Sequence, residues 1–426
     1  MDLLPGSNVY HSGVKFCFAI RRNVAIAILA LLLADGCKQK NNSMSEAATD
    51  SGEAGEAVPL DPTVTRELFL KWRSPRFGTL NPQRMNNPVW EWLVKSRINA
   101  YQATQRFNGP SAMDAGPGWC FDRFGQSSNQ LPDGRVVFIA GEHEDSYDPD
   151  FYIYNDVVIQ HPDGRIDIFG YPREVFPPTD FHTATVVGNR IVLIGSLGYP
   201  DERRPGETPV TILELGALSI SSVQTSGSTP GWIHSHQATL SEDGGSILVQ
   251  RGKLDRGGKD KSLVENIDDW RLHLGNWRWE RLTERRWPRW EVRRKDSKTN
   301  HLFEYERAEW AKRFPEFSRP EAQPIHLKEI KIPSLQDELG KSPDLDLFAR
   351  LYKPRVEHED MAGLEDEYNV HRIKVEGVVV RYVEDEHSIQ MTVEGELPQK
   401  ILDTLTRDLF EKLTALENAP CELIRL

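Results

Sequence analysis

Residues 186–196 read VVGNRIVLIGS, and they form one copy of a repeated pattern of turn and apolar strand. Residues 131–141 (LPDGRVVFIAG) and 240–252 (LSEDGGSILVQRG) are further copies. In each copy, a Gly/Asp or Gly/Asn turn is followed by an apolar strand that stops at a small residue or a glycine. The copies begin 54 or 55 residues apart, which is the length of one supersecondary unit.

Additional strands complete each copy. The second and third copies also begin alike, with His182-Thr-Ala-Thr185 and His236-Gln-Ala-Thr239. We call the residues that lead into the first strand of each repeat its lead-in. Third and fourth strands are expected after each apolar strand, at Asn155–Gln160 and Ile166–Phe169, at Val210–Leu215 and Ser219–Gln224, and at Trp270–Leu274 and Trp277–Leu282. The pattern predicts a mainly β chain with four strands per repeat.

Four strands in a repeat of this length resemble the kelch repeat of β-propellers. Arg123-Phe-Gly-Gln before the first copy and Trp279-Glu-Arg-Leu282 in the third belong to the likeness. The resemblance implies a kelch-like β-propeller domain over residues 119–306, which is partial because propellers close with about 4–8 blades. The free edge of a partial propeller must be covered. The helical segment or the C-terminal domain could cover it, diverged blades could extend the propeller (one of them at 287–306), or a homodimer could complete it.

The flanks of the repeat differ from it. Residues 63–118 are predicted to be a partly helical segment, because apolar residues from Trp90 to Tyr101 recur at three- and four-residue spacing. Residues 307–330 are predicted to be a linker, and residues 331–426 a small α+β domain. In that domain we expect strands at 371–383 and 388–394, a helix opened by Pro398 and a last strand at 421–426.

The N-terminus carries an export signal. Arg21 and Arg22 precede the apolar run VAIAILALLLA at 24–34, which is too short to cross a bilayer core that needs about 20 residues. Small residues before Cys37 resemble the lipobox of bacterial lipoproteins, so residues 1–36 are predicted to be a signal peptide, Cys37 the lipidated residue, and residues 37–62 a lipid-attached flexible tether. This predicts a protein anchored in the cell envelope and facing the periplasm, with a secreted or a cytosolic protein as alternatives.

Net charge limits the class of ligand that we expect, and the cysteine count limits the number of disulfides. The 52 basic and 64 acidic side chains give a net charge of −12, which argues against a nucleic-acid binder. We therefore expect a protein or glycan ligand in the envelope, contact with the membrane through the lipid anchor only, and no nucleic acid. Outside the leader region, Cys120 and Cys421 are predicted to be two free buried thiols, with one disulfide as the alternative.

No common catalytic motif stands in the chain, but one histidine constellation does. His234 and His236 are two residues apart on a predicted strand, so their side chains should share a face. His182 holds in its repeat the position of His236, and Asp180 lies close by. Such a set suits Zn²⁺ or Fe, whereas the alternative is that these histidines cap turns.

Two further candidate sites are charged. The loop at 142–150 is rich in carboxylates of the kind that bind Ca²⁺, namely Glu142, Glu144, Asp145, Asp148 and Asp150. The default interpretation is a solvated loop, and a Ca²⁺ site is the alternative. Basic residues alternate with tryptophans near the end of the repeat, and the candidate binding residues among them are Arg278, Arg281, Arg285, Trp287 and Trp290. They could bind an anionic ligand. The alternative is that the arginines stack on the tryptophan rings and serve only the fold. No cofactor is expected unless one of these sites binds Ca²⁺ or Zn²⁺.

This organisation leads us to expect a binding protein. A rigid β domain that presents variable loops at 142–151, 197–209 and 253–266 is typical of a binding protein. One specific version is a periplasmic immunity or inhibitor protein whose acidic C-terminal domain blocks a basic toxin or hydrolase. The alternative is a propeller-type enzyme, metal-dependent or not, acting on a sugar or small molecule at His182, His234 and His236.

Overall fold

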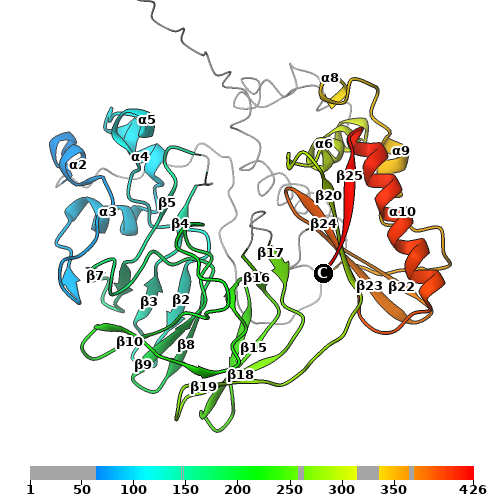
Figure 1. Cartoon of the computed structure of the whole chain (residues 1–426). Coiled ribbons are helices and arrows are strands. Elements are labelled where there is room, and N and C mark those ends of the chain that lie inside the picture. The colour runs from blue at the N-terminus through cyan, green and yellow to red at the C-terminus, as the bar shows by residue number, and fades with distance from the viewer. Residues whose placement is uncertain (1–63, 145, 147, 258–262, 314–334, 364–368) are drawn as a thin grey trace, which may run out of the picture. The chain divides into compact units, whose positions relative to one another are not determined.

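The computed structural model describes residues 64–426, except residues 145, 147, 258–262, 314–334 and 364–368 (Figure 1). The predicted signal peptide, Cys37 and the tether lie outside the described residues, as does most of the predicted linker. The chain divides into two compact units, the first ending at Glu284 and the second beginning at Arg285. No helix in the described ranges is both long enough and apolar enough to cross a membrane.

The first unit begins with short helices, namely α2 (Arg66–Trp72), α3 (Pro88–Ser96), α4 (Ala100–Arg106) and α5 (Ala112–Ala115). The Asn87 side chain caps α3 by accepting from the N–H groups of Val89 and Trp90, and Pro88 fits the first turn. The expected apolar stripe is broken, because Arg97 adopts a left-handed conformation that ends α3. Tyr101, the last residue of that expected stripe, consequently lies on α4 with 64 % of its surface exposed.

Three antiparallel four-stranded meanders follow, one for each sequence copy. The first contains β2 (Ser127–Gln130), β3 (Val136–Ile139), β6 (Val157–Gln160) and β7 (Ile166–Gly170). The second contains β8 (Thr183–Val187), β9 (Arg190–Ile194), β10 (Val210–Glu214) and β11 (Ile220–Ser222). The third contains β14 (Gln237–Leu240), β15 (Ser246–Gln250), β18 (Trp270–His273) and β19 (Arg278–Arg281). The predicted count of four strands per repeat is confirmed.

Shorter strands extend these sheets or stand beside them. β1 (Gln83–Arg84) pairs with β7, and β12 (Ser226–Gly227) pairs in parallel with β19. Two small sheets stand beside the meanders. β4 (Glu142–His143) pairs with β5 (Tyr152–Ile153) within the loop between the second and third strands of the first meander. β13 (Trp232–His234), which precedes β14, pairs with β16 (Lys253–Asp255), and β16 pairs with β17 (Leu263–Glu265) in the corresponding loop of the third meander. Each sheet of the first unit is open.

Backbone hydrogen bonds join the three meanders at their lead-ins. The Phe181 N–H donates to the Gly125 carbonyl at 3.0 Å, and the Ser235 N–H donates to the Phe181 carbonyl at 2.8 Å. These three residues occupy equivalent places before β2, β8 and β14, and all have left-handed φ, at 61°, 46° and 52°. Gly125 is required by contact as well as by φ, because a Cβ there would lie 2.3 Å from the Phe181 nitrogen.

One apolar core of the first unit packs α2, α3 and α4 against the first meander, with Trp90 and Ile168 among its buried side chains. Two more lie between neighbouring meanders. One buries side chains of the first two, including Val137, Ile139, Ile191 and Leu193. The next buries side chains of the second and third, including Val192, Ile194, Ile247 and Val249. Residues 191–194 therefore alternate between two cores, as expected for a strand with both faces covered. This explains why the copy that reads RIVLI has no polar residue after its arginine.

The second unit is one sheet with helices. Its strand order is β21 (Glu359–Asp360), β22 (Val370–Val375), β23 (Val378–Glu384), β24 (Ser388–Val393), β20 (Arg289–Arg294) and β25 (Cys421–Arg425). Helix α10 (Gln399–Glu417) buries its leucine stripe against it, and α6 (Leu302–Arg313), α8 (Leu335–Leu339) and α9 (Leu345–Phe348) contribute to the same core. The expected small C-terminal sheet and helix are confirmed, with more strands than predicted.

Three boundaries differ from the expectations. β20 pairs with β24 and β25, so 289–294 belongs to the C-terminal sheet and not to a fourth blade or a domain that ends at 306. The predicted linker begins inside α6. The single strand expected at 371–383 is a hairpin, because Glu376 and Gly377 both have left-handed φ and form a tight turn.

The two cysteines of the described residues, Cys120 and Cys421, are both buried and both free, as predicted. Burial raises the pKa of the Cys120 thiol to about 11, and burial also raises that of Cys421. Both thiols therefore stay protonated at neutral pH, which makes them poor nucleophiles.

Candidate functional site

The lead-in histidines His182 and His236 occupy equivalent positions, as their sequence context predicts. His182 Nε2 lies 2.9 Å from the Ser127 hydroxyl, at the start of β2. His236 Nε2 lies 2.8 Å from the Thr183 hydroxyl, at the start of β8. Each imidazole therefore bonds to the first strand of the preceding meander. Together with the backbone bonds described above, these contacts fasten one meander to the next.

Burial determines the charge state of both rings. It lowers the pKa of His182 to about 4 and that of His236 to about 3, with the neighbouring His182 as a further cause for His236. At neutral pH both imidazoles are uncharged, so each nitrogen at the hydroxyl contact can donate or accept according to the tautomer.

His234 does not join the other two histidines. Ser235 lies between His234 and His236 in the left-handed conformation, so strand alternation stops there. His234 belongs to β13, which pairs with β16, whereas His236 leads into β14. The His234 Nδ1 atom lies 3.0 Å from the Ser235 hydroxyl. The predicted shared face is therefore wrong, and no trio of His, Cys, Asp or Glu in the described residues is arranged to hold a metal ion.

Asp180, expected beside the histidines, instead holds the loop after β9. Its Oδ1 accepts from the Gly198 N–H at 2.6 Å and from the Ser196 hydroxyl at 3.3 Å. Burial raises the pKa of this carboxyl, while the Gly198 N–H, the Glu142 carboxyl and the Ser196 hydroxyl act in the opposite direction. Asp180 thus links the second long loop to the carboxylate that begins the first.

The described carboxylates of the predicted Ca²⁺ loop have partners within the protein, and two of them, Glu144 and Asp150, approach the same nitrogen of His143, at 3.3 and 4.0 Å. Glu142 lies in β4 and bridges Phe124, while Glu144 Oε1 lies 3.3 Å from His143 Nε2. Asp148 accepts from the Asp150 N–H at 2.7 Å, and Asp150 itself accepts from the Gly118 N–H at 2.6 Å. Burial raises the pKa of Asp150 and lowers that of His143 to about 4. Asp145 lies outside the described residues.

A buried ion pair that the sequence analysis missed fixes the base of this loop. Arg123 donates through Nη2 to Asp156 Oδ2 at 3.0 Å, and the Trp119 indole N–H donates to the same oxygen at 2.8 Å. The Arg123 side chain is completely buried and stacks on the Tyr154 ring. The Arg-Phe-Gly-Gln sequence at 123–126 was the available signal, but its partner carboxylate lies 33 residues further along the chain.

The basic and aromatic residues predicted as one binding patch are divided between the two units. In the first unit Arg278 is exposed on β19, and Arg281 pairs with Asp268 at 2.6 Å while its guanidinium covers Trp270. In the second unit Arg285 covers Trp287, and Trp290 is buried in β20 as part of the core. For Arg281 and Arg285, the alternative of arginines stacked on tryptophans is confirmed.

The three long loops leave equivalent ends of the meanders. Each begins by pairing with the lead-in of its own meander: Glu142 with Phe124, Leu197 with Asp180, and β16 with β13. Gly141 and Ser196 also donate to the carbonyls of Thr179 and Ile233, just before the next lead-in. Arg203 adds a link between loops, since it donates to the Leu197 carbonyl and lies 3.4 Å from Asp255.

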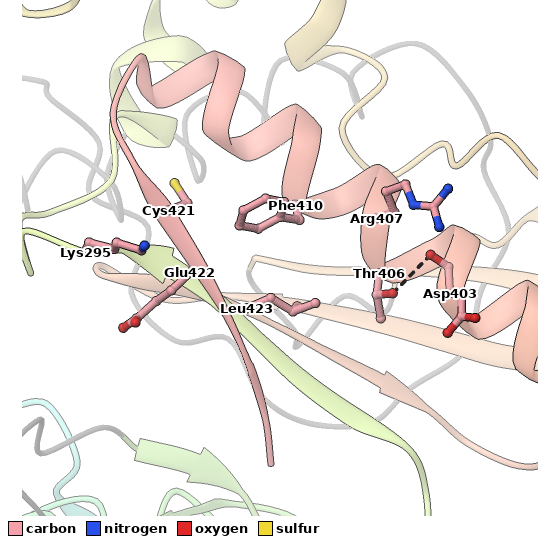
Figure 2. Close-up of a pocket in the computed structure, with 8 residues that line it drawn as sticks. All are labelled: Lys295, Asp403, Thr406, Arg407, Phe410, Cys421, Glu422 and Leu423. Carbon is pink, nitrogen blue, oxygen red and sulfur yellow. Dashed lines mark hydrogen bonds between the residues drawn. The ribbon is translucent and has the colours of Figure 1, made fainter.

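A groove of about 530 Å³ lies in the second unit between α10 and β25 (Figure 2). Its wall on α10 consists of Asp403, Thr406, Arg407 and Phe410, and its wall on the sheet consists of Lys295, Cys421, Glu422 and Leu423. The sequence analysis predicted no site here, because it identified only a helix and a last strand in this region and no chemical motif.

No protein-family model matches the chain, and the search of curated proteins finds no match either.

Proposed function

We propose that this chain is an envelope-anchored lipoprotein that binds a protein or glycan ligand through the loops at 142–151, 197–209 and 253–266. The supporting observation is that these loops leave equivalent ends of three linked meanders, where buried polar contacts hold their bases. Rigid strands that present loops in this way are typical of recognition surfaces. In this proposal the meanders are blades of a partial kelch-like propeller.

Two features of the loops favour recognition over catalysis. His182 and His236, the residues available for acid–base chemistry, are each engaged by a hydroxyl of the neighbouring strand. The loop at 197–209 carries opposite charges at its tip, where Arg204 and Glu207 lie 3.7 Å apart and expose 74 % and 67 % of their side chains. Exposed charges of both signs can orient a polar partner and exclude wrongly charged ones.

The membrane part of the proposal rests on sequence. Cys37 follows an apolar run and precedes a polar stretch, which together suit a lipid anchor and a tether. A periplasmic immunity or inhibitor protein is the specific form that we favour, with a basic toxin or hydrolase as the ligand. The net charge of −12 is of the sign that attracts such a partner.

A photo-crosslinking amino acid tests the binding face. Introduced at Arg204 in the full chain expressed in bacteria, it should give adducts of discrete mass. The matched control is Asn189, which is also exposed and lies in the β8–β9 turn at the opposite end of the same meander. Adducts at position 204 but not at 189 support the proposal. Equal labelling at both positions, or none at 204, contradicts it.

A further inference from the structure

The outer edge of β25 is a strand edge to which no described strand is bonded. β25 is the last strand in the sheet order and pairs on one side only, with β20. An edge strand of this kind presents N–H and C=O groups that can pair with another strand. The groove beside α10 runs along this edge and is lined by Cys421 and Leu423 of β25 itself.

The register shows which groups of β25 point outward. Lys295 donates to the Pro420 carbonyl at 2.9 Å, and Leu426 donates to the Arg289 carbonyl at 3.1 Å. In an antiparallel pair, bonded and non-bonded residues alternate, so the even-numbered residues of β25 bond to β20. The backbone groups of Cys421, Leu423 and Arg425 therefore face the free edge.

The side chains at this edge are incompletely covered. Leu423 exposes 40 % of its surface, which is unusual for a large apolar residue in this structure. Figure 2 shows it pointing toward the turn of α10 that carries Thr406, with Phe410 on the same side of the helix. Asp403 and Arg407, one helical turn apart, are both exposed on that side.

We propose that a second copy of this chain docks here, with β25 of each copy pairing antiparallel across a two-fold axis perpendicular to the sheet. Such an interface uses the same patch on both copies, so the strand must be complementary to itself. Pairing centred on Leu423 meets this condition, because it overlaps the whole of β25 and aligns the outward backbone groups of Cys421, Leu423 and Arg425. It places Leu423 against its own symmetry mate and Glu422 against Ile424.

The neighbouring registers are poorer. A pairing centred on Glu422 would set two glutamates directly opposite each other, and like charges in that position are destabilising. A pairing centred on Ile424 would align only residues 423–425. The sequence of β25 therefore selects one arrangement, which is the property expected of a strand that meets its own copy.

Charges on α10 fit the same symmetry. A two-fold axis perpendicular to the sheet keeps both helices on one face and makes them antiparallel. An acidic and a basic residue one turn apart then meet in the opposite order, so Asp403 of each copy faces Arg407 of the other. This charge complementarity favours a second copy over an extended peptide from another protein, which would need no such pairing along α10.

The first test is the oligomeric state of the full chain, measured by sedimentation across a range of concentrations. We expect a monomer–dimer equilibrium, and we expect Leu423→Arg to raise the dissociation constant by about tenfold or more, since two arginines would meet at the axis. The matched control is Leu80→Arg, which alters a 64 % exposed leucine of the first unit and should leave the equilibrium unchanged.

The second test keeps the proposal falsifiable should Leu423→Arg disturb folding. Asp403→Arg and Arg407→Asp should each weaken the dimer, because each sets like charges against one another across the axis. The double variant, which restores an opposite-charge pair, should recover most of the loss. A chain that stays monomeric, a dimer unaffected by Leu423→Arg, or a double variant no better than the singles would overturn the proposal. A monomer that instead binds extended peptides at β25 would identify the other occupant.

Discussion

The imidazoles of His182 and His236 are predicted to make the first unit sensitive to acid. Both pKa values lie below the ordinary value of 6.5, near 4 and 3, because burial disfavours the charged ring. Between pH 6.5 and 4 the unfolded chain takes up protons at these sites while the folded chain does not. Stability must therefore fall as the pH falls, by about 1.4 kcal/mol per pH unit for each histidine.

The measurement is urea unfolding at several pH values in that window. Replacing both histidines by glutamine, which keeps a polar contact to the hydroxyls, should flatten the pH dependence. His387→Gln, at a half-exposed position in the second unit, is the control and should leave the slope unchanged. A double variant that is as acid-sensitive as the wild type would show that other groups dominate.

Lys412 illustrates a buried charge whose partners are all specified. Its Nζ donates to Asp408 at 2.6 Å and to the carbonyls of Arg350 and Lys353 at 2.8 and 2.7 Å. Lys412→Met leaves two buried carbonyls without this donor and leaves Asp408 with Arg355, 3.1 Å away, as its remaining cationic partner. We therefore expect a loss of about 3 kcal/mol, the lower end of the range for breaking a buried ion pair. Thermal unfolding measures it, with exposed Lys400→Met on the same helix as the control. Equal stability of the two variants would contradict the assignment.

For single residues, the sequence predicted which positions are equivalent better than it predicted which side chains contact one another. The equivalence of His182 and His236 followed from the repeat and is confirmed by their matching contacts. The grouping with His234 failed because a single left-handed residue, Ser235, turns the chain between two sheets. Serine has no strong preference for that conformation, so its sequence carried no warning.

Among the elements, the lead-ins determine how the meanders fit together. Gly125 brings the backbone so close to Phe181 that any side chain must displace it. Gly125→Ala should therefore weaken the junction between the first two meanders and lower the melting temperature. Gly188→Ala is the matched control, since Gly188 has nearly the same φ of 60° but open space around it.

The difference between these two variants isolates the effect of the close contact, because both carry the backbone strain of about 1–3 kcal/mol. Similar melting temperatures for the two proteins would mean that the junction adapts to a methyl group.

Strand-level expectations succeeded where the pattern was local. The apolar strands of the repeat, β24 and α10 all lie where alternation or a leucine stripe placed them. The hairpin at 376–377 was missed although Glu-Gly is a turn signal, because apolar residues continue without interruption on both sides. β20 was assigned to the wrong sheet, since its pairing partners lie about 100 residues or more further along the chain.

For the whole molecule, the division at residues 284 and 285 separates the proposed roles. The meanders carry the proposed binding loops, and the C-terminal sheet carries the proposed docking edge. The two proposals rest on different residues. A variant that abolishes crosslinking at position 204 should consequently leave the dissociation constant of the dimer unchanged, which distinguishes failure of one proposal from failure of the other.

Attachment to the membrane is the property that affects the whole chain at once. The substitution Cys37→Ser removes the sulfur that a lipid would modify, so the protein should move from the membrane to the soluble fraction on cell fractionation. Ser43→Ala, in the same polar stretch, should stay with the membrane. Retention of Cys37→Ser in the membrane fraction would contradict the proposed anchor.

The position of β20 between β24 and β25 has a consequence for biosynthesis. This strand is made early, directly after the first unit, yet both of its neighbours emerge from the ribosome much later. A nascent chain that stops before residue 388 would carry β20 with both edges bare, ready to aggregate or to be captured by a chaperone. Premature termination should therefore be more damaging to this protein than its modular architecture suggests, and proteolytic quality control would remove such fragments.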